Sequence, residues 1–276
     1  MNRIISACLL TVISCHCFAQ SYDLGKLSTF KIPDWWHHPY VLDIKQDFHY
    51  YLSKEILYKA GDALLVAGVI ANTGIDRSVH KQWQQSIRNN TLNRFFSLPQ
   101  RIGGVRWWSF PLYLSSMVIG DLGNLYRFGD PVYNWGYRSL RTALLGGIQQ
   151  VIFTNLLGSG RPINGADSNW RPFAHRTGVS GHAFYGAIPF LTAAHMTNPD
   201  SLRYLLFAAS TLPALSRVNS DAHYLSQIIV GWAFAYLSSV AIYQTEMQKT
   251  ESSEPIWRVS AFPAKGGAFL VAKLKF

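Results

Sequence analysis

Three short polar segments in the second half of the chain combine arginine, serine and histidine with glycine. Residues 158–162 are Gly-Ser-Gly-Arg-Pro, residues 178–182 are Gly-Val-Ser-Gly-His, and residues 216–223 are Ser-Arg-Val-Asn-Ser-Asp-Ala-His. Each segment adjoins an apolar stretch and is therefore expected at the end of a helix. Each alone is compatible with an ordinary loop or a capped helix, but together they supply the groups of an oxyanion site.

The anion would be held by arginines and by one helix start. Ser180 is the predicted N-cap of the helix that follows, so its hydroxyl, the Gly181 amide and the helix N-terminus would face one anion. Gly181 lets an oxyanion approach the backbone closely. Arg161 and Arg217 supply planar guanidinium groups that match phosphate oxygens.

Two histidines add reactive groups to this anion site. His182 falls in the first turn of its helix, and we expect His223 in the first turn of the longest apolar helix, capped by Ser220 or Asp221. The helix dipole there disfavours the protonated imidazole. Gln227, four residues later, can accept a hydrogen bond from one ring nitrogen and leave the other free to attack. One histidine can then attack phosphorus while the other protonates the leaving oxygen.

A series of helices must position these segments. Between about residues 56 and 243, apolar stretches are punctuated by Gly, Pro and Asn, which predicts an all-α helical bundle. The mean hydropathy is near neutral at +0.05, and the longest stretch carries His223 and Gln227, so buried core helices are favoured over membrane spans. The predicted helical stretches are Ala63–Ala71, Pro111–Ile119, Thr142–Leu157, Ala183–His195, Leu202–Leu215 and Ala222–Tyr243.

The two ends of the chain differ from this helical domain, which is expected over residues 56–247. Residues 1–19 form a predicted signal peptide, and residues 20–55 an irregular N-terminal segment. Residues 248–276 are predicted as a polar linker and a short C-terminal β-hairpin, since two alternating stretches flank Lys265-Gly266-Gly267.

The leader combines Arg3, the apolar run Ile4–Ser14 and a small-residue cleavage site ending at Ala19. The alternatives are a lipobox at residues 12–15, which would place a lipid on Cys15, and an uncleaved anchor. All three place the rest of the chain outside the cytoplasm, in the bacterial periplasm, with membrane association possible. The only cysteines are Cys8, Cys15 and Cys17, so cleavage after residue 19 leaves no disulfide or thiolate metal site.

The net charge and the side chains that could bind a metal limit the kinds of ligand expected for this chain. The net charge of +10 attracts phosphates or lipid head groups. No basic arm or nucleic-acid motif is present, so we expect no nucleic-acid partner. The cluster Trp35-Trp36-His37-His38 fits aromatic packing better than metal binding, because no partner ligands lie at zinc spacing. We therefore predict no metal and no cofactor.

The order of the three segments resembles the type 2 phosphatidic acid phosphatase (PAP2) superfamily, which includes bacterial class A acid phosphatases and vanadium haloperoxidases. The family pattern is K-x6-R-P, then P-S-G-H, then S-R-x5-H-x3-D, and the matching motifs lie within residues 154–227. The resemblance implies a helical bundle of the PAP2/haloperoxidase type with no metal requirement. It also implies His223 as the nucleophile that forms a phosphohistidine and His182 as the general acid. The implied phosphate-binding residues are Arg161, Arg217, Ser180 and Gly181.

Three positions depart from the family pattern. Val179 replaces a proline, Thr154 replaces the lysine, and Gln227 replaces the aspartate that orients the nucleophile. Arg171 or Arg176 is the candidate to restore the charge of the missing lysine.

The expected function is hydrolysis of a phosphomonoester or pyrophosphate, of a lipid such as phosphatidate or of a small phosphoester. One alternative is a degenerate member that binds phosphorylated lipid with little or no turnover. Another is a vanadate-dependent haloperoxidase that uses the same pocket.

Overall fold

The computed structural model describes the backbone of residues 39–103, 106–123, 129–253, 256–264 and 267–275. Side chains are described for residues 41–102, 109–122 and 130–249. The chain divides into two compact units, Met1–Leu42 and Asp43–Phe276, and the site belongs to the second. The predicted leader, its lipobox alternative and the Trp35–His38 cluster lie outside the described residues.

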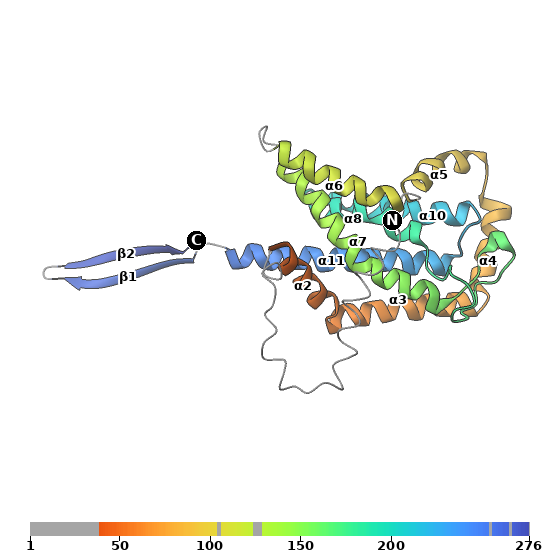
Figure 1. Cartoon of the computed structure of the whole chain (residues 1–276), viewed down its shortest axis with the longest axis horizontal. Coiled ribbons are helices and arrows are strands. Elements are labelled where there is room, and N and C mark those ends of the chain that lie inside the picture. Colours follow the sequence, from red (N-terminus) through yellow and green to blue (C-terminus); the bar gives the residue numbers. More distant parts are fainter. Residues whose placement is uncertain (1–38, 104–105, 124–128, 254–255, 265–266, 276) are drawn as a thin grey trace, which may run out of the picture. The chain divides into compact units, whose positions relative to one another are not determined.

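The described part of the chain up to residue 253 is largely helical, which confirms the predicted all-α bundle (Figure 1). The α-helices are α2 (Pro39–Tyr51), α3 (Lys54–Asn72), α4 (Ile75–Gln82), α5 (Asn90–Gly103), α6 (Arg106–Gly123), α7 (Gly129–Leu157), α8 (Gly181–His195), α9 (Asp200–Ala209), α10 (Leu212–Asn219) and α11 (Leu225–Ser253). A π-helical turn, η3 (Trp83–Ile87), follows α4, and a 3₁₀ turn, η5 (Pro162–Asn164), precedes α8.

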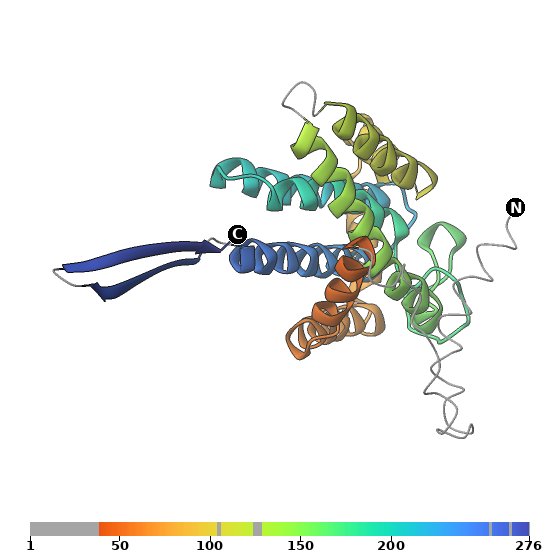
Figure 2. The same cartoon turned by 60° about the vertical axis from the view of Figure 1, so that its left-hand side comes forward.

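The core lies between α7, α8 and α11, which gather at the centre of the bundle in both views (Figures 1 and 2). Phe184 and Ile188 of α8 are fully buried beside Phe234 of α11. Gly146 of α7 allows this close approach, because a Cβ there would lie 2.6 Å from the Ser238 hydroxyl and 2.7 Å from the Phe184 ring. The ends of these three helices are thereby brought together.

Most of the predicted stretches lie within longer helices, and three further differences change the assignment of a segment. Residues 39–51, expected as part of an irregular segment, form α2. The single helix predicted over Leu202–Leu215 is two helices, since Pro213 lies in the first turn of α10, where a missing amide hydrogen costs least. The last helix begins at Leu225 rather than Ala222 and continues to Ser253, through much of the predicted linker.

An ionic network around the buried side chain of Arg141 holds α2 and the second half of α11 against α7. Arg141 of α7 is 2% exposed and donates to both carboxylate oxygens of Asp47 on α2, at 2.7 and 2.6 Å. It also donates to Glu246 of α11, while Thr245 donates to Asp47 at 2.6 Å. These contacts join residues about a hundred or two hundred positions apart, so no local pattern predicts them.

After α11, β1 (Ile256–Ala264) and β2 (Gly267–Lys275) pair antiparallel at the place where the sequence predicts a hairpin. Ile256 is opposite Lys275, and Ala264 is opposite Gly267. The strands adjoin no other strand among the described residues.

By length and composition, one described helix qualifies as a membrane span, α11 over Leu225–Lys249. In its most apolar window, 67% of the residues are buried within the protein, and buried core helices of soluble proteins pass the same test. Helix α3 together with α4 and η3 also passes, with a bend of 73° between the two parts.

Candidate functional site

Gln227, in the first turn of α11, is hydrogen-bonded on both sides of its buried amide. Its Oε1 lies 2.8 Å from His223 Nδ1 and accepts from the Tyr224 backbone amide at 3.0 Å. Its Nε2 donates to the Gly160 carbonyl at 2.7 Å and to the Ser159 hydroxyl at 3.1 Å. The bond to Tyr224 is that of a capping box, in which the third helical residue reaches back to the amide at the helix start.

These contacts fix the tautomer of His223. The Tyr224 amide only donates and the Gly160 carbonyl only accepts, so the Gln227 oxygen must face Tyr224 and its nitrogen must face Gly160. His223 Nδ1 faces the same oxygen and therefore carries the hydrogen in the neutral ring. The Nε2 of His223 then carries a lone pair that is available as a nucleophile.

Gln227 also joins the second polar segment to the first and third. Its backbone carbonyl accepts from the Ser180 amide at 3.1 Å. The Ser180 hydroxyl accepts from the Ala183 amide at 3.3 Å, so Ser180 is the N-cap of α8 as predicted. Gly231 permits this approach of α8 to α11, because a Cβ there would lie 2.5 Å from the Ser180 carbonyl oxygen. Gly181 and His182 then begin α8 beside the first turn of α11.

Arg161 follows the end of α7 and precedes η5. The turn begins at Gly158, whose φ of +56° is rarely adopted by residues with a side chain. The Arg161 carbonyl accepts from the amides of Asn164 and Ala166, at 3.2 and 3.3 Å. The backbone of Arg161 is therefore held by its own turn, which leaves the side chain for other contacts.

Arg217 and His223 are linked through the backbone. The Arg217 carbonyl, in the last turn of α10, accepts from the amides of Ala222 and His223 at 2.9 and 3.2 Å. His223 was expected in the first turn of its helix, but it precedes α11 by two residues. Ser220 is the C-cap of α10 and does not cap α11. The prediction that the helix dipole disfavours protonation of His223 assumed a place in the first turn of α11, which His223 does not occupy.

Arg161, Arg217 and the two histidines lie close enough to act on one another electrostatically. Burial, followed by Arg161 and with a smaller contribution from Arg217, lowers the pKa of His223 to about 3. Burial, followed by Arg217 and then Arg161, lowers the pKa of His182 to about 4. Burial and Arg161 also lower the pKa of Arg217. Both histidines are therefore neutral at pH 7 in the free protein, beside two guanidinium charges.

The arginines have donors that the described protein does not satisfy. The Nε atoms of Arg161 and Arg217 are buried and have no hydrogen-bond partner among the described residues. An unpaired buried donor costs about 1–3 kcal/mol, more when it is charged. An oxyanion between the two guanidinium groups would satisfy both donors and offset their mutual repulsion.

A model of the PAP2 superfamily matches residues 105–251, which include all three polar segments, helices α6 to α10 and α11 up to residue 251. The chain belongs to the PAP2 superfamily. Comparisons with curated proteins and with solved structures gave no match. Membership of this superfamily indicates phosphatase-type activity on phosphorylated small molecules or lipids.

Thr154 occupies the position of the PAP2 lysine and is bonded within the protein. Its hydroxyl donates to the Gln150 carbonyl at 2.7 Å and accepts from Gln150 Nε2 at 2.8 Å. The amide of Gln150 is thereby held 3.9 Å from the position that a Cβ on Gly181 would occupy. A neutral donor, in place of a lysine ammonium, therefore lies beside the start of α8.

The two arginines expected to replace the lysine charge are not brought into the site. Arg171 pairs with Asp167 at 2.7 Å, and its side chain is 58% exposed. Arg176 is exposed, and neither arginine contributes to the shifted pKa values of His182 or His223. The cations that act on these histidines are Arg161 and Arg217.

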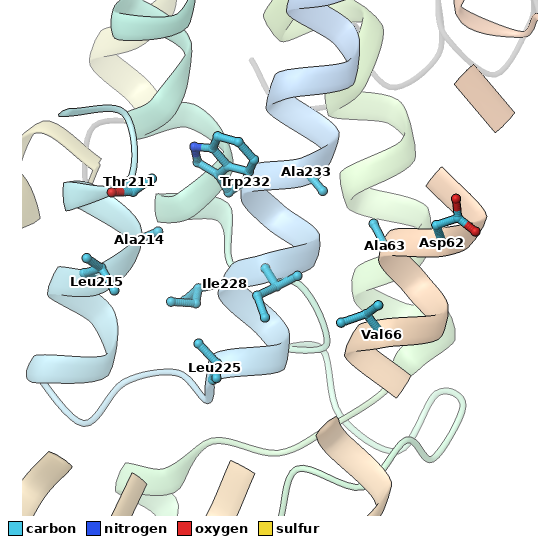
Figure 3. A pocket seen from close by; sticks show the side chains of 11 residues that line it. Asp62, Ala63, Val66, Thr211, Ala214, Leu215, Leu225, Ile228, Trp232 and Ala233 are labelled. Carbon is cyan, nitrogen blue, oxygen red and sulfur yellow. The ribbon is translucent and has the colours of Figure 1, made fainter. Parts of the chain in front are cut away.

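An apolar cleft of about 500 Å³ lies between α3, α10 and α11, and Figure 3 shows side chains from all three helices facing it. Its walls include Val66, Leu215 and Trp232, with Asp62 as the one charged lining residue. Arg217 lies at the end of α10 that adjoins α11, and His223 lies in the loop between these two helices. No cluster of three or more His, Cys, Asp or Glu suited to a metal occurs in the part of the chain that the structure describes.

Sequence reasoning missed the residues that support the three segments from elsewhere. Ser159 and the Gly160 carbonyl orient Gln227, although only Arg161 stood out in that segment. His80 of α4 contacts Asp221 of the third segment, and Asp76 of α4 contacts Ser226 just after it, across separations of 141 and 150 residues. Their spacing of four places them on one helix face, but no local signal connects that face to the site.

Proposed function

We propose that the protein hydrolyses a phosphomonoester or pyrophosphate, of a lipid, through a phosphohistidine at His223. The observation that carries the proposal is the fixed amide of Gln227, because it leaves the Nε2 lone pair of His223 as the reactive atom. The half-buried side chains of Arg161 and Arg217, whose Nε atoms are buried, supply the charge that a phosphoryl group requires.

The reaction would proceed in two balanced steps. His223 Nε2 attacks phosphorus and the bond from phosphorus to the leaving oxygen breaks, while protonated His182 donates a proton to that oxygen. Water then attacks the phosphohistidine, His182 accepts a proton from the water, and the bond from phosphorus to nitrogen breaks to release phosphate. The Ser180 cap and the Gly181 amide would hold the phosphoryl oxygens at the start of α8.

His182 must be protonated for the first step, although its pKa is about 4 in the free protein. Burial and the two arginines cause this low value, and a bound dianion opposes the contribution of the arginines. Phosphate binding and protonation of His182 would therefore occur together, so the substrate itself would prepare the acid.

Apolar surface supports a lipid substrate and a membrane-associated protein. On α6, the side chains of Leu112, Leu114, Val118, Ile119 and Leu122 are at least 50% exposed. Large apolar side chains that are exposed along one helix are typical of membrane or protein contacts. The apolar cleft beside α10 and α11 can accept a hydrocarbon chain (Figure 3). We propose the bacterial periplasm, at the membrane surface or within the membrane, as the location.

The test is phosphate release by the full chain in detergent, from phosphatidate, a polyprenyl pyrophosphate and p-nitrophenyl phosphate. We expect release by the wild type and none by His223→Ala. His175→Ala is the matched control, because His175 is exposed in the loop before α8 and should be dispensable. Equal release by the wild type and His223→Ala would refute the assignment.

A binding protein without turnover is the second candidate, favoured by one observation. The lysine and the aspartate of the family pattern are replaced by the neutral residues Thr154 and Gln227. Neither Arg171 nor Arg176 acts on the site histidines. In this case, the wild type would bind vesicles that contain phosphatidate and release no phosphate. Phosphate release that depends on His223 would exclude it.

A further inference from the structure

Helix α4 and the turn η3 hold the α10–α11 loop, which we define as residues 220–224. This loop carries His223 and connects the helix that bears Arg217 to the helix that bears Gln227. Both α4 and η3 precede residue 105, where the match to the PAP2 superfamily begins. Their contacts with the loop are therefore an addition from outside the matched region.

The loop has an unfavourable backbone conformation at Asp221. Its φ is +60°, and Phe173 is the only other described residue, glycine aside, with a positive φ. The left-handed region costs a residue with a side chain about 1–2 kcal/mol, less for aspartate than for most residues. Such a conformation persists only where surrounding contacts hold it.

Contacts from three directions hold Asp221. His80 Nε2 of α4 lies 2.5 Å from its carboxylate Oδ1. The backbone carbonyl of Asp221 accepts from the Ile163 amide of η5 at 3.0 Å, and the backbone amide of Asp221 donates to the Val218 carbonyl at 3.2 Å. The His80 ring also packs edge-on against the Tyr224 ring, with centroids 5.6 Å apart. His80 thus contacts the residues on either side of the 222–223 pair.

Successive turns of α4 and η3 repeat this pattern on both sides of the loop. Asp76, four residues before His80, is fully buried and accepts from the Ser226 amide at 3.0 Å and from its hydroxyl at 2.5 Å. Four residues after His80, Gln84 donates to the Val218 carbonyl at 2.7 Å. One helical face therefore fixes the loop at its entry, at its turn and at its exit into α11.

From these contacts we propose that His80 is a positioning residue for His223, acting through Asp221 and Tyr224. Gln227 sets the ring orientation and tautomer of His223, while the contact of His80 with Asp221 sets the position of the backbone that carries the ring. His80 has no contact with Arg161, Arg217 or Ser180 among the described interactions. Its loss should therefore affect nucleophilic attack more than phosphate binding.

The proposal rests on the proposed function and is tested with His80 variants of the full chain. His80→Ala removes the contact with Asp221. His80→Gln keeps a donor near the position of Nε2, and His80→Asn keeps one only near the position of Nδ1, so Gln should retain the function and Asn should not. Asp221→Asn, which tolerates the left-handed conformation and keeps an acceptor, is expected to behave like the wild type.

For His80→Ala and His80→Asn we expect kcat to fall by about tenfold to a hundredfold, since a misplacement of 1 Å costs up to 10²-fold. KM and the Kd of sulfate should stay within about twofold of the wild type, as expected when only the chemical step is affected. Unchanged kcat in both variants would refute the proposal. A parallel loss of sulfate binding would also refute it, because it would indicate general disruption of the site.

A second readout does not depend on activity. Diethyl pyrocarbonate acylates neutral imidazole, and the rate at which His223 is modified can be followed by mass spectrometry of its peptide. His223 is 1% exposed, so we expect slow modification in the wild type and His80→Gln and several-fold faster modification in His80→Ala. If the wild type releases no phosphate, the proposed function fails, and equal modification rates of His223 would independently overturn the role of His80.

Discussion

Anion binding at this site should take up a proton, and His182 is the group expected to receive it. In the free protein the pKa of His182 is about 4, because of burial and then of Arg217 and Arg161. A dianion between the arginines cancels much of their repulsion of the imidazolium, so the pKa rises in the complex. A group whose pKa rises on binding makes binding stronger at low pH and weaker as the pH increases.

The magnitude follows from the two limiting pKa values. While the pH lies between the pKa of the free and of the bound form, affinity falls by about tenfold per pH unit, or about 1.36 kcal/mol. If the bound dianion restores the ordinary value of 6.5 from about 4, the affinity changes by up to roughly 300-fold across that interval. Above pH 6.5 the dependence should disappear.

Isothermal titration calorimetry with sulfate measures this effect without a titrating ligand, because sulfate remains a dianion throughout. Titrations at pH 5, 6 and 7 give the affinity, and buffers of different ionisation enthalpy count the protons taken up. His182→Gln should remove the pH dependence. His195→Gln should keep it, although the pKa of His195 is also about 4, because His195 lies at the far end of α8 and stacks on Tyr243.

The reasoning would be wrong if His182→Gln and the wild type showed the same pH dependence, or if no proton were taken up near pH 6. The first result would assign the proton to another group. His223 would then be the candidate, since its pKa in the free protein is about 3. The second would mean that burial alone, and not the arginines, holds these pKa values down.

Two further substitutions in the site, and one control on α3, test the packing of the protein. Gln227→Glu should lower the free energy of unfolding by about 1–3 kcal/mol at pH 8 and less at pH 5, because a carboxylate cannot donate to the Gly160 carbonyl while a carboxylic acid can. Urea denaturation at both pH values checks this, and a pH-independent difference would contradict the assigned orientation of the amide. Gly231→Ala should cost about 1–3 kcal/mol, since its Cβ would lie 2.5 Å from the Ser180 carbonyl oxygen. Gly61→Ala, whose Cβ would meet nothing within 4 Å, should instead stabilise α3 by about 0.5–1 kcal/mol, and equal effects of the two in thermal denaturation would contradict the packing.

The parts of the site that depend on near neighbours could be predicted from the sequence. Ser180 caps α8, as local helix geometry predicts. Gln227 contacts His223 four residues away, as predicted, but it does so from the first turn of α11 by reaching back past the start of the helix. Most of the predicted helices are present for the same reason, since apolar periodicity and breakers are local signals.

The parts that depend on distant residues could not be predicted. The sequence offers Ser220 and Asp221 as caps of α11, but Gln227 and Asp76 bind the amides at its start instead. Competition between caps is decided by which partner the fold brings near, and Asp76 lies 150 residues away from the amide that it accepts. For this reason His223 precedes α11, although a local reading places it within the first turn.

The two charged positions that the chain lacks are best understood together. The PAP2 pattern has a lysine where Thr154 lies and an aspartate where Gln227 lies, so the two replacements remove one positive and one negative charge. The net charge of the pocket is therefore unchanged, and two guanidinium groups still face a phosphate that carries about −1.5 to −2 charges. An aspartate restored alone would offset one of these positive charges and weaken anion binding.

The geometry around Gln227 follows the same logic. An aspartate is one methylene shorter and has no hydrogen to donate, so it could not replace the bonds to Ser159 and the Gly160 carbonyl. Glutamine satisfies these groups and still holds the hydrogen on His223 Nδ1. The neutral amide does not supply the negative charge with which an aspartate would stabilise His223 as its ring becomes cationic. In the serine-protease triad, replacement of the orienting aspartate by asparagine costs about 10⁴ in rate, largely through the wrong tautomer. Because Gln227 retains the productive tautomer, we expect the loss at this site to be smaller.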